Sequence, residues 1–207
     1  MHVIAAIAQK GGPGKTTLVS CLAVHATPKL SVGMLDLDPQ QSLAEWWQVR
    51  GEPSAPQLYT GADTPSEAVE LLTAKGVDWL FIDTGPGLLH AIEPVIEVAD
   101  IVLVPVKASA FDLMAIVPTL EIVKASGKPY LLVLNECIST KMENTAAELL
   151  RSEGHPVAKT MIKQRVAYRS AVTTGHTGPE RDGKCAEEIS SLWDEIKTAA
   201  RRRKQRG

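Results

Sequence analysis

The feature that most constrains this 207-residue chain is a glycine-rich stretch from Gln9 to Thr17, which lies between a short apolar run and a segment with helical spacing. Glycines in such a loop let successive backbone N–H groups turn inward, and the next helix points its positive dipole end at the same place. Its end, Gly14-Lys15-Thr16, meets the usual phosphate-loop pattern, but the first glycine of that pattern is replaced by Gln9, and a second lysine stands at position 10. The stretch therefore predicts a polyphosphate-binding loop between a strand and a helix.

The side chains of the loop have distinct expected roles. Lys15 is expected to place its charge between the β- and γ-phosphates of a nucleotide, and Thr16 to offer its hydroxyl to a magnesium ion. The backbone amides of the loop are expected to bind phosphate oxygens. The nucleotide-binding residues predicted in this stretch are Lys10, Gly11, Gly12, Pro13, Gly14, Lys15, Thr16 and Thr17.

Apolar runs and helical spacing alternate along the rest of the chain. The apolar runs predict strands at residues 3–8, 31–35, 57–59, 78–82, 101–106, 130–134 and 158–162. Helical spacing predicts helices at residues 16–26, 42–50, 64–76, 88–98, 111–126, 143–152, 164–174 and 185–203. Such alternation implies a parallel sheet covered on both faces, and 207 residues are too few for two ordinary domains. We therefore predict one doubly wound α/β domain over residues 1–207, with a mostly parallel sheet flanked by helices, as in phosphate-loop NTPases.

Three aspartates follow predicted strands, at the edge of the sheet where ligands of open α/β proteins bind. Asp83 ends the strand at 78–82 and has the placement of the acid that holds magnesium, usually through water. Asp36 is expected to support the water shell of the metal, and Asp38, which lies farther out, to orient the attacking water. The alternative is that one of this pair is only a solvated turn residue. The predicted metal site is Thr16, Asp36 and Asp83, and the predicted catalytic residues are Lys10, Lys15 and Asp38.

Composition excludes several classes of protein. Hydrophobic residues make up 44% of the chain and charged residues 22%, as in soluble globular proteins, and no apolar run approaches the roughly eighteen residues that span a bilayer. The N-terminal run has no basic flank, so we expect a strand and not a signal peptide, and a cytoplasmic protein. The cysteines, Cys21, Cys137 and Cys185, fit no metal-ligand spacing and are expected to be packing residues.

The net charge of −2 hides an asymmetry along the chain. Residues 1–150 contain 9 Lys/Arg against 17 Asp/Glu, and residues 151–207 contain 13 against 7. Basic clusters attract DNA phosphates in a salt-dependent manner that is independent of sequence, although a basic tail can also be a solvated helix end whose charge suits the dipole. The residues predicted to bind DNA are Lys163, Arg165, Arg169, Arg201, Arg202, Arg203 and Lys204, of which the last four belong to a basic helix or tail at about 185–207.

Together these motifs resemble those of the ParA/MinD family of ATPases, which have a variant phosphate loop. Residues 10–17 fit the family's loop, residues 36–40 its second motif and residues 81–83 its third. The resemblance extends through residues 105–106 and 164–168 to the terminal helix, and it is greatest to small plasmid-partition ParA proteins without an N-terminal DNA-binding domain.

The resemblance implies an ATPase that uses ATP and Mg²⁺, turns over slowly alone and forms a homodimer in the ATP state, in which Lys10 reaches the nucleotide of the partner. It further implies non-specific binding of double-stranded DNA, a centromere-binding adaptor of the ParB type that stimulates hydrolysis, nucleoid association, and partition of plasmid or chromosome DNA. Asn135 resembles the position that contacts adenine in relatives, although Glu136 follows it in place of arginine. The family often has Asp-Thr-Pro-Pro after the third strand, whereas this chain has Asp-Thr-Gly-Pro at 83–86.

Two other functions stay open. A ParA-like ATPase can position a protein cargo, and an ATP-dependent metabolic enzyme can use the same scaffold. The second is disfavoured because Cys137 and Cys185 lack the context of cluster ligands and because 207 residues leave little room for a substrate pocket. Membrane association of the MinD kind is not expected, since the chain ends in two alanines and basic residues where such proteins have large apolar side chains.

Overall fold

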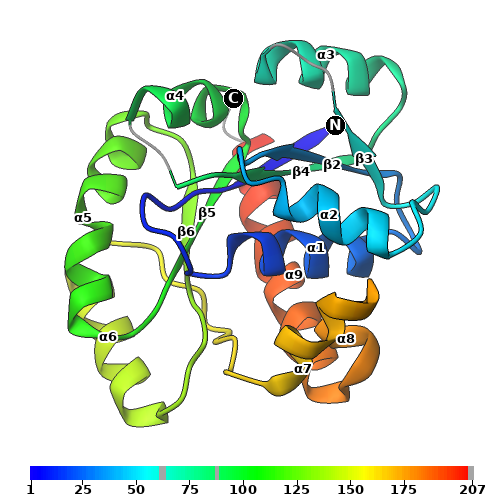
Figure 1. Ribbon diagram of the computed structural model, residues 1–207. Helices are drawn as coiled ribbons and strands as arrows, with labels where there is room; N and C mark the ends of the chain where they lie inside the picture. The colour runs from blue at the N-terminus through cyan, green and yellow to red at the C-terminus, as the bar shows by residue number, and fades with distance from the viewer. Residues whose placement is uncertain (61–63, 87–88, 205–207) are drawn as a thin grey trace.

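The computed structural model describes residues 1–60, 64–86 and 89–204, with the backbone alone for 89–91 and 201–204 (Figure 1). Six strands form one sheet in the order β3-β2-β4-β1-β5-β6, and all neighbouring strands are parallel. They are β1 (His2–Ala6), β2 (Val32–Leu37), β3 (Gln57–Tyr59), β4 (Trp79–Thr84), β5 (Ile101–Val106) and β6 (Tyr130–Leu134). The predicted doubly wound α/β fold is confirmed.

Helices cover both faces of this sheet. They are α1 (Lys15–Ala26), α2 (Ser42–Val49), α3 (Pro65–Ala74), α4 (Leu89–Val98), α5 (Ala110–Ala125), α6 (Thr140–Ser152), α7 (Val166–Ser170), α8 (Gly178–Arg181) and α9 (Gly183–Lys204), with a 3₁₀ turn at Ala171–Thr174. In Figure 1, α3 to α6 lie on one side of the sheet, and α1, α2 and α9 lie on the other. Alternate residues of β1 point into the two cores, Val3 and Ala5 toward the first group and Ile4 and Ala6 toward the second.

The predicted strand at 158–162 is wrong. Isolated bridges flank this segment, Leu132 with Val157 and Cys137 with Lys163, and the N–H groups of Ala158 and Ile162 donate to the carbonyl oxygens of Leu132 and Leu134. Its middle does not join the sheet because the backbone N–H groups of residues 159 and 160 donate to the carboxylate of Glu195 in α9, each at 2.8 Å. A side chain from α9 therefore takes two of the backbone hydrogen bonds that would have continued a seventh strand along β6.

Several helix boundaries also differ from the predictions. The helix predicted at 164–174 is the short α7 followed by the 3₁₀ turn, and the glycine-rich loop at 175–183 contains α8, whose capping box joins Thr177 and Glu180. The helix predicted from residue 143 begins at Thr140. The start predicted at residue 88 lies outside the described residues.

The parallel arrangement brings the loops that follow the strands to one edge of the sheet. Asp36 in β2 and Ala6 in β1 both pair with Asp83 in β4, so these three strands end at the same level. The phosphate loop leaves β1 between its two neighbours, β4 and β5. Residues from four separate parts of the chain consequently surround that loop.

Candidate nucleotide-binding site

Asp83 and Thr16 form the centre of the site. The hydroxyl of Thr16 donates to Oδ2 of Asp83 at 2.6 Å, and Asp83 is fully buried at the end of β4. Burial raises the pKa of Asp83 to about 7; the hydrogen bond from Thr16 opposes this shift, and the negative charge of Asp36 adds to it. The two residues meet as the sequence predicted, and the carboxylate is held where its charge is poorly solvated.

The second carboxylate oxygen of Asp83, Oδ1, is buried and has no hydrogen-bond partner. A buried polar atom of this kind is costly unless a ligand satisfies it. The predicted metal site therefore fits Mg²⁺, which prefers oxygen ligands and is usually bound by one or two carboxylates together with substrate phosphates. Among the described residues no cluster of three or more His, Cys, Asp and Glu side chains could hold a metal ion.

Lys15 is the first residue of α1, and its side chain is buried in the same place. Burial lowers the pKa of Lys15, and the charges of Asp83 and Asp38 partly restore it. The preceding Gly14 has φ of 88°, a left-handed conformation that favours glycine and turns the loop into the helix. At the front of the loop, residues 10 to 12 are exposed. The front of the loop is therefore open to a ligand, and the poorly solvated ammonium group of Lys15 lies behind it.

Asn135 follows β6 and is buried against the phosphate loop. Its side-chain amide donates to the carbonyl oxygen of Pro13 at 2.7 Å, and a Cβ atom on Gly14 would lie 2.2 Å from that amide nitrogen. Asn135 therefore braces the loop, and its contact with adenine stays a prediction. It also lines a small pocket that opens beside the loop, together with Gly14, Thr17, Glu136, Lys163, Gln164, Arg165, Tyr168 and Arg169.

Asp36 and Asp38 make different contacts. Asp36 accepts hydrogen bonds from the backbone N–H groups of Asp38 at 3.0 Å and Ala44 at 2.9 Å, so its carboxylate stabilises the start of α2. Burial raises the pKa of Asp36, whereas these hydrogen bonds lower it. Asp38 accepts from the N–H of Gln40 at 2.9 Å. A Cβ atom on Gly85 would lie 3.1 Å from Oδ1 of Asp38, so the Gly-Pro departure from the family motif lets this loop approach β4.

The additional lysine, Lys10, forms an ion pair within its own chain. Its Nζ lies 3.2 Å from Oδ1 of Asp112 in the first turn of α5, and its side chain remains 59% exposed. A hydrogen bond from the hydroxyl of Ser109 and the charge of Lys10 lower the pKa of Asp112. Asp112 was not predicted as a site residue. Its spacing from Ser109 marks a helix start in the sequence, but nothing there indicates that this helix reaches the loop.

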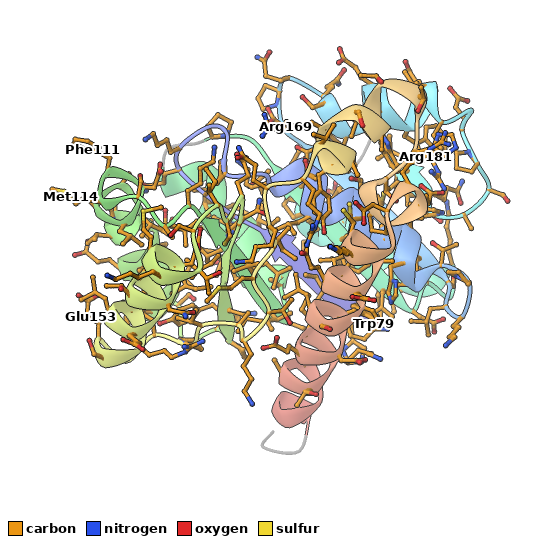
Figure 2. The ribbon with its side chains drawn as sticks, turned by 90° about the horizontal axis from the view of Figure 1, so that it is seen from below. Trp79, Phe111, Met114, Glu153, Arg169 and Arg181 are labelled. Carbon is orange, nitrogen blue, oxygen red and sulfur yellow. The ribbon has the colours of Figure 1, made fainter. Side chains whose placement is uncertain are left out.

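The residues predicted to bind DNA lie in different environments. Arg165 precedes α7 and is paired with Glu188 at 2.6 Å, and the hydroxyl of Tyr168 donates to the same carboxylate at 3.0 Å. Arg169 is exposed, and Figure 2 shows it on the same part of the molecule as Arg181, which was not predicted. The backbone N–H of Lys163 donates to Glu188 at 3.3 Å, and the side chains of residues 201 to 204 lie outside the described part. The structure thus leaves Arg169 without the ion pair that holds Arg165 to α9.

Residues 4–177 match the family model of the CobQ/CobB/MinD/ParA nucleotide binding domain. The chain belongs to this family. It is 32% identical over 204 residues to maintenance of carboxysome distribution protein A from Halothiobacillus neapolitanus, covering 90% of this chain and 92% of the relative. It is 28% identical over 213 residues to the chromosome-partitioning ATPase Soj from Thermus thermophilus, covering 84% of this chain and 86% of the relative.

A solved structure shares the fold of this ParA/MinD-type domain. The putative plasmid partition protein of Borrelia burgdorferi bound to AMPPNP has a TM-score of 0.74 at 16% identity, with 95% of this chain and 99% of that chain covered. Within the described part of the chain, no helix is both long enough and apolar enough to cross a membrane.

Proposed function

We propose that this ParA/MinD-type protein is an ATP-hydrolysing switch that dimerises when ATP and Mg²⁺ are bound. The observation that carries the proposal is the pair of buried charged residues Lys15 and Asp83, with Thr16 hydrogen-bonded to Asp83, behind an open phosphate loop. This group combines a poorly solvated cation with a carboxylate oxygen that lacks a partner. Bound Mg²⁺ would neutralise charge on the phosphates and on Asp83.

The residues of the chain divide the remaining work. Lys15 and the loop amides hold the phosphates, and Asn135 fixes the loop through Pro13. Asp38, which extends from the edge of β2, positions the attacking water. A strong general base is not required, because positioning and charge stabilisation dominate phosphoryl transfer. Slow turnover of the protein alone follows, since these groups are completed only in the dimer.

Lys10 is the residue through which dimerisation would complete the site. It stands at the exposed front of the loop, where its ion-pair partner among the described residues is Asp112. An ion pair as exposed as this contributes roughly 0–1 kcal/mol, so the phosphates of a second protomer can compete for the ammonium group. In the proposed dimer, Lys10 leaves Asp112 and contacts the nucleotide of the partner.

In the proposed function the protein binds double-stranded DNA without sequence preference, through Arg169, Lys163 and the basic end of α9. The proposed cargo is a protein assembly, because one relative distributes carboxysomes according to its name. Partition of plasmid or chromosome DNA is the second candidate, favoured by the chromosome-partitioning relative. In both cases an adaptor protein links the cargo to the switch and stimulates hydrolysis.

Phosphate release and light scattering after size-exclusion chromatography test the switch. Wild-type protein with Mg²⁺ and ATP should dimerise and hydrolyse slowly, and Asp38→Ala should dimerise without hydrolysis. Lys15→Ala should lose nucleotide binding, and Lys10→Ala should bind ATP but remain monomeric. A wild-type protein and an Asp38→Ala variant that both stay monomeric with ATP would refute the proposal.

Binding to random duplex DNA tests the proposed interaction with DNA. Affinity should require ATP and fall steeply with salt, because neutralised phosphates release counterions. Arg169→Ala should weaken binding and reduce the salt slope by about one. The cargo is then identified in the host: deleting the gene should disperse or cluster a protein assembly, whereas a raised plasmid-loss rate with normal assemblies would favour DNA partition.

A further inference from the structure

Exposed apolar side chains gather on α5, α6 and the turn between β6 and α6. Nine large apolar side chains are exposed among the described residues, and six of them lie here. Phe111 is 80% exposed and Met114 is 72% exposed, although both belong to a well-formed helix. The six residues are Phe111, Met114, Val117, Ile138, Met142 and Leu149. Met114, Val117 and Leu149 line one groove, and apolar surface gathered in this way marks interaction sites more often than single exposed residues do.

A groove of about 440 Å³ runs between the two helices. Met114 and Val117 form one wall, and Leu149 and Leu150 form the other. Because α5 and α6 each follow a strand of the same parallel sheet, they run in the same direction, and their exposed positions recur every three or four residues. A groove lined by two such rows accepts the apolar face of a third helix.

The charges at one end of the groove favour a basic occupant. Glu121 and Glu153 lie there, with Lys124 as the opposing charge. The C-terminal ends of α5 and α6 lie at this same end, and each adds the negative end of a helix dipole. His155 also lines this end, and burial lowers its pKa, so the ring adds little positive charge at pH 7. The groove between α5 and α6 therefore ends in a region of net negative potential.

A second copy of this chain is a poor occupant for the whole groove. The proposed dimer forms across the loop that carries Lys10, and only the first turn of α5 lies beside that loop. Helix geometry places residue 124 about 18 Å farther along α5 than residue 112. Outside the six residues of the patch, the exposed large apolar residues of the described chain are Val49, Leu71 and Val166, each on a different helix. No described helix other than α5 and α6 therefore offers a row that could fill the groove.

We propose that the groove between α5 and α6 is the docking site for an amphipathic helix of a partner protein, whose basic end faces Glu121 and Glu153. The proposal rests on the proposed function, because this partner is the adaptor of the switch. Figure 2 shows Phe111, Met114 and Glu153 along one side of the molecule, away from Arg169 and Arg181, so DNA and the partner can bind at the same time.

The position of the groove explains how docking would change hydrolysis. Phe111 and Met114 flank Asp112 in the first turn of α5, and Asp112 holds Lys10. A helix in the groove packs on Leu113 and Met114, which adjoin Asp112 in the chain, so it shifts this turn and weakens the ion pair. Docking therefore favours the release of Lys10 to the nucleotide of the second protomer, which raises the dimerised fraction at a given ATP concentration and with it the rate of turnover.

Fluorescence anisotropy with synthetic peptides tests the docking site on the full chain without nucleotide. Three labelled 18-residue peptides are compared: an amphipathic helix with lysines at one end, the same helix with glutamates in their place, and a scrambled sequence of the basic peptide. The basic helix should bind at least tenfold more tightly than either of the others. Equal binding of the three peptides, or no binding, would overturn the proposal.

Groove variants locate the binding. Met114→Glu combined with Leu149→Glu should weaken binding of the basic peptide at least tenfold, whereas Leu71→Glu, at a 51% exposed site on α3, should change it less than twofold. Glu121→Gln combined with Glu153→Gln keeps the apolar walls and should reduce affinity several-fold at low salt. Unchanged binding by both double variants, or self-association of the wild type that the first one abolishes, would overturn the proposal.

Measuring the rate of ATP turnover distinguishes failure of this inference from failure of the proposed function. With ATP, the basic peptide should raise phosphate release by the wild type at least threefold and leave the Met114→Glu, Leu149→Glu variant at its own basal rate. Peptide binding that does not change the turnover of the wild type would overturn the link through Asp112. ATP-dependent dimerisation of the wild type without peptide reports on the switch alone, so its failure is recognised separately.

Discussion

At neutral and higher pH, neutralising Asp83 should stabilise the protein when nucleotide and Mg²⁺ are absent, and increasingly so as the pH rises. The pKa of this buried carboxyl is about 7 in the fold against an ordinary value of 3.8, so the folded state binds its proton more tightly than the unfolded state does. The contribution of Asp83 to stability is therefore fully present below about pH 4 and is lost as the pH rises through 7. Asp83→Asn removes this dependence.

The magnitude follows from the shift. Three pKa units correspond to about 4 kcal/mol, the destabilisation that ionised Asp83 causes at pH 8, and at pH 5 only about 1.5 kcal/mol of it has developed. The asparagine amide can still accept the hydrogen bond from Thr16. It also places an unpaired NH₂ group at the buried Oδ1 position, at a cost of about 1–3 kcal/mol that does not vary with pH. The pH dependence is thus a cleaner measure than the stability at one pH.

Urea unfolding in EDTA at pH 5 and pH 8 measures the effect. The stability difference between Asp83→Asn and the wild type should favour the variant more at pH 8 than at pH 5, by about 2–3 kcal/mol. Asp78→Asn is the matched control, because Asp78 is exposed just before the opposite end of β4, and the same difference should stay near zero. With Mg²⁺ and ATP the order should reverse, since only the wild type gains the ligand's binding energy. An Asp83→Asn variant whose stability parallels that of the wild type at both pH values would refute the reasoning.

Three further substitutions have defined outcomes. Gly175→Ala should lower the free energy of unfolding in urea by about 3 kcal/mol or more, because its Cβ would lie 2.4 Å from the backbone where α2 ends. The control Gly154→Ala, at a glycine with positive φ but open space around it, should cost only about 1 kcal/mol. Equal costs for the two variants would contradict the clash. Asp112→Asn should release Lys10 and lower the ATP concentration for half-maximal dimerisation about twofold, as measured by sedimentation velocity. A higher concentration would contradict the proposal that the ion pair with Asp112 competes with dimerisation. Thr16→Val should reduce ATP affinity about tenfold in calorimetry with Mg²⁺ and much less in EDTA, and equal losses would exclude a metal contact.

The sheet could be predicted from the sequence because its strands are buried on both faces. β4 and β5 are buried throughout and appear in the sequence as continuous apolar runs, which indicate central strands of a parallel sheet. The segment at 158–162 has Lys159 and Thr160 among its apolar residues, and the backbone N–H groups of these two residues donate to Glu195 and not to β6. A competing acceptor 35 residues away leaves no mark on the local pattern.

The site shows the same division. The loop glycines and the acids that follow strands were recognisable because phosphate binding needs particular residue types at fixed spacing. The partners of those residues were not, since Asn135 reaches Pro13 across 122 positions and Lys10 reaches Asp112 across 102. The pairing of Arg165 with Glu188 likewise depends on how α7 packs against α9.

By itself, the sequence determined the chemistry of this protein: a phosphate loop, a lysine and three acids, placed where a parallel sheet would bring them together. Only the tertiary structure decided the surroundings of those residues: the burial of Asp83, the ion pair of Lys10 with Asp112 and the apolar groove between α5 and α6. The physical reason is that residue type and spacing are local properties of a chain. Desolvation, ion pairing and unfilled surface arise only when distant segments pack against one another.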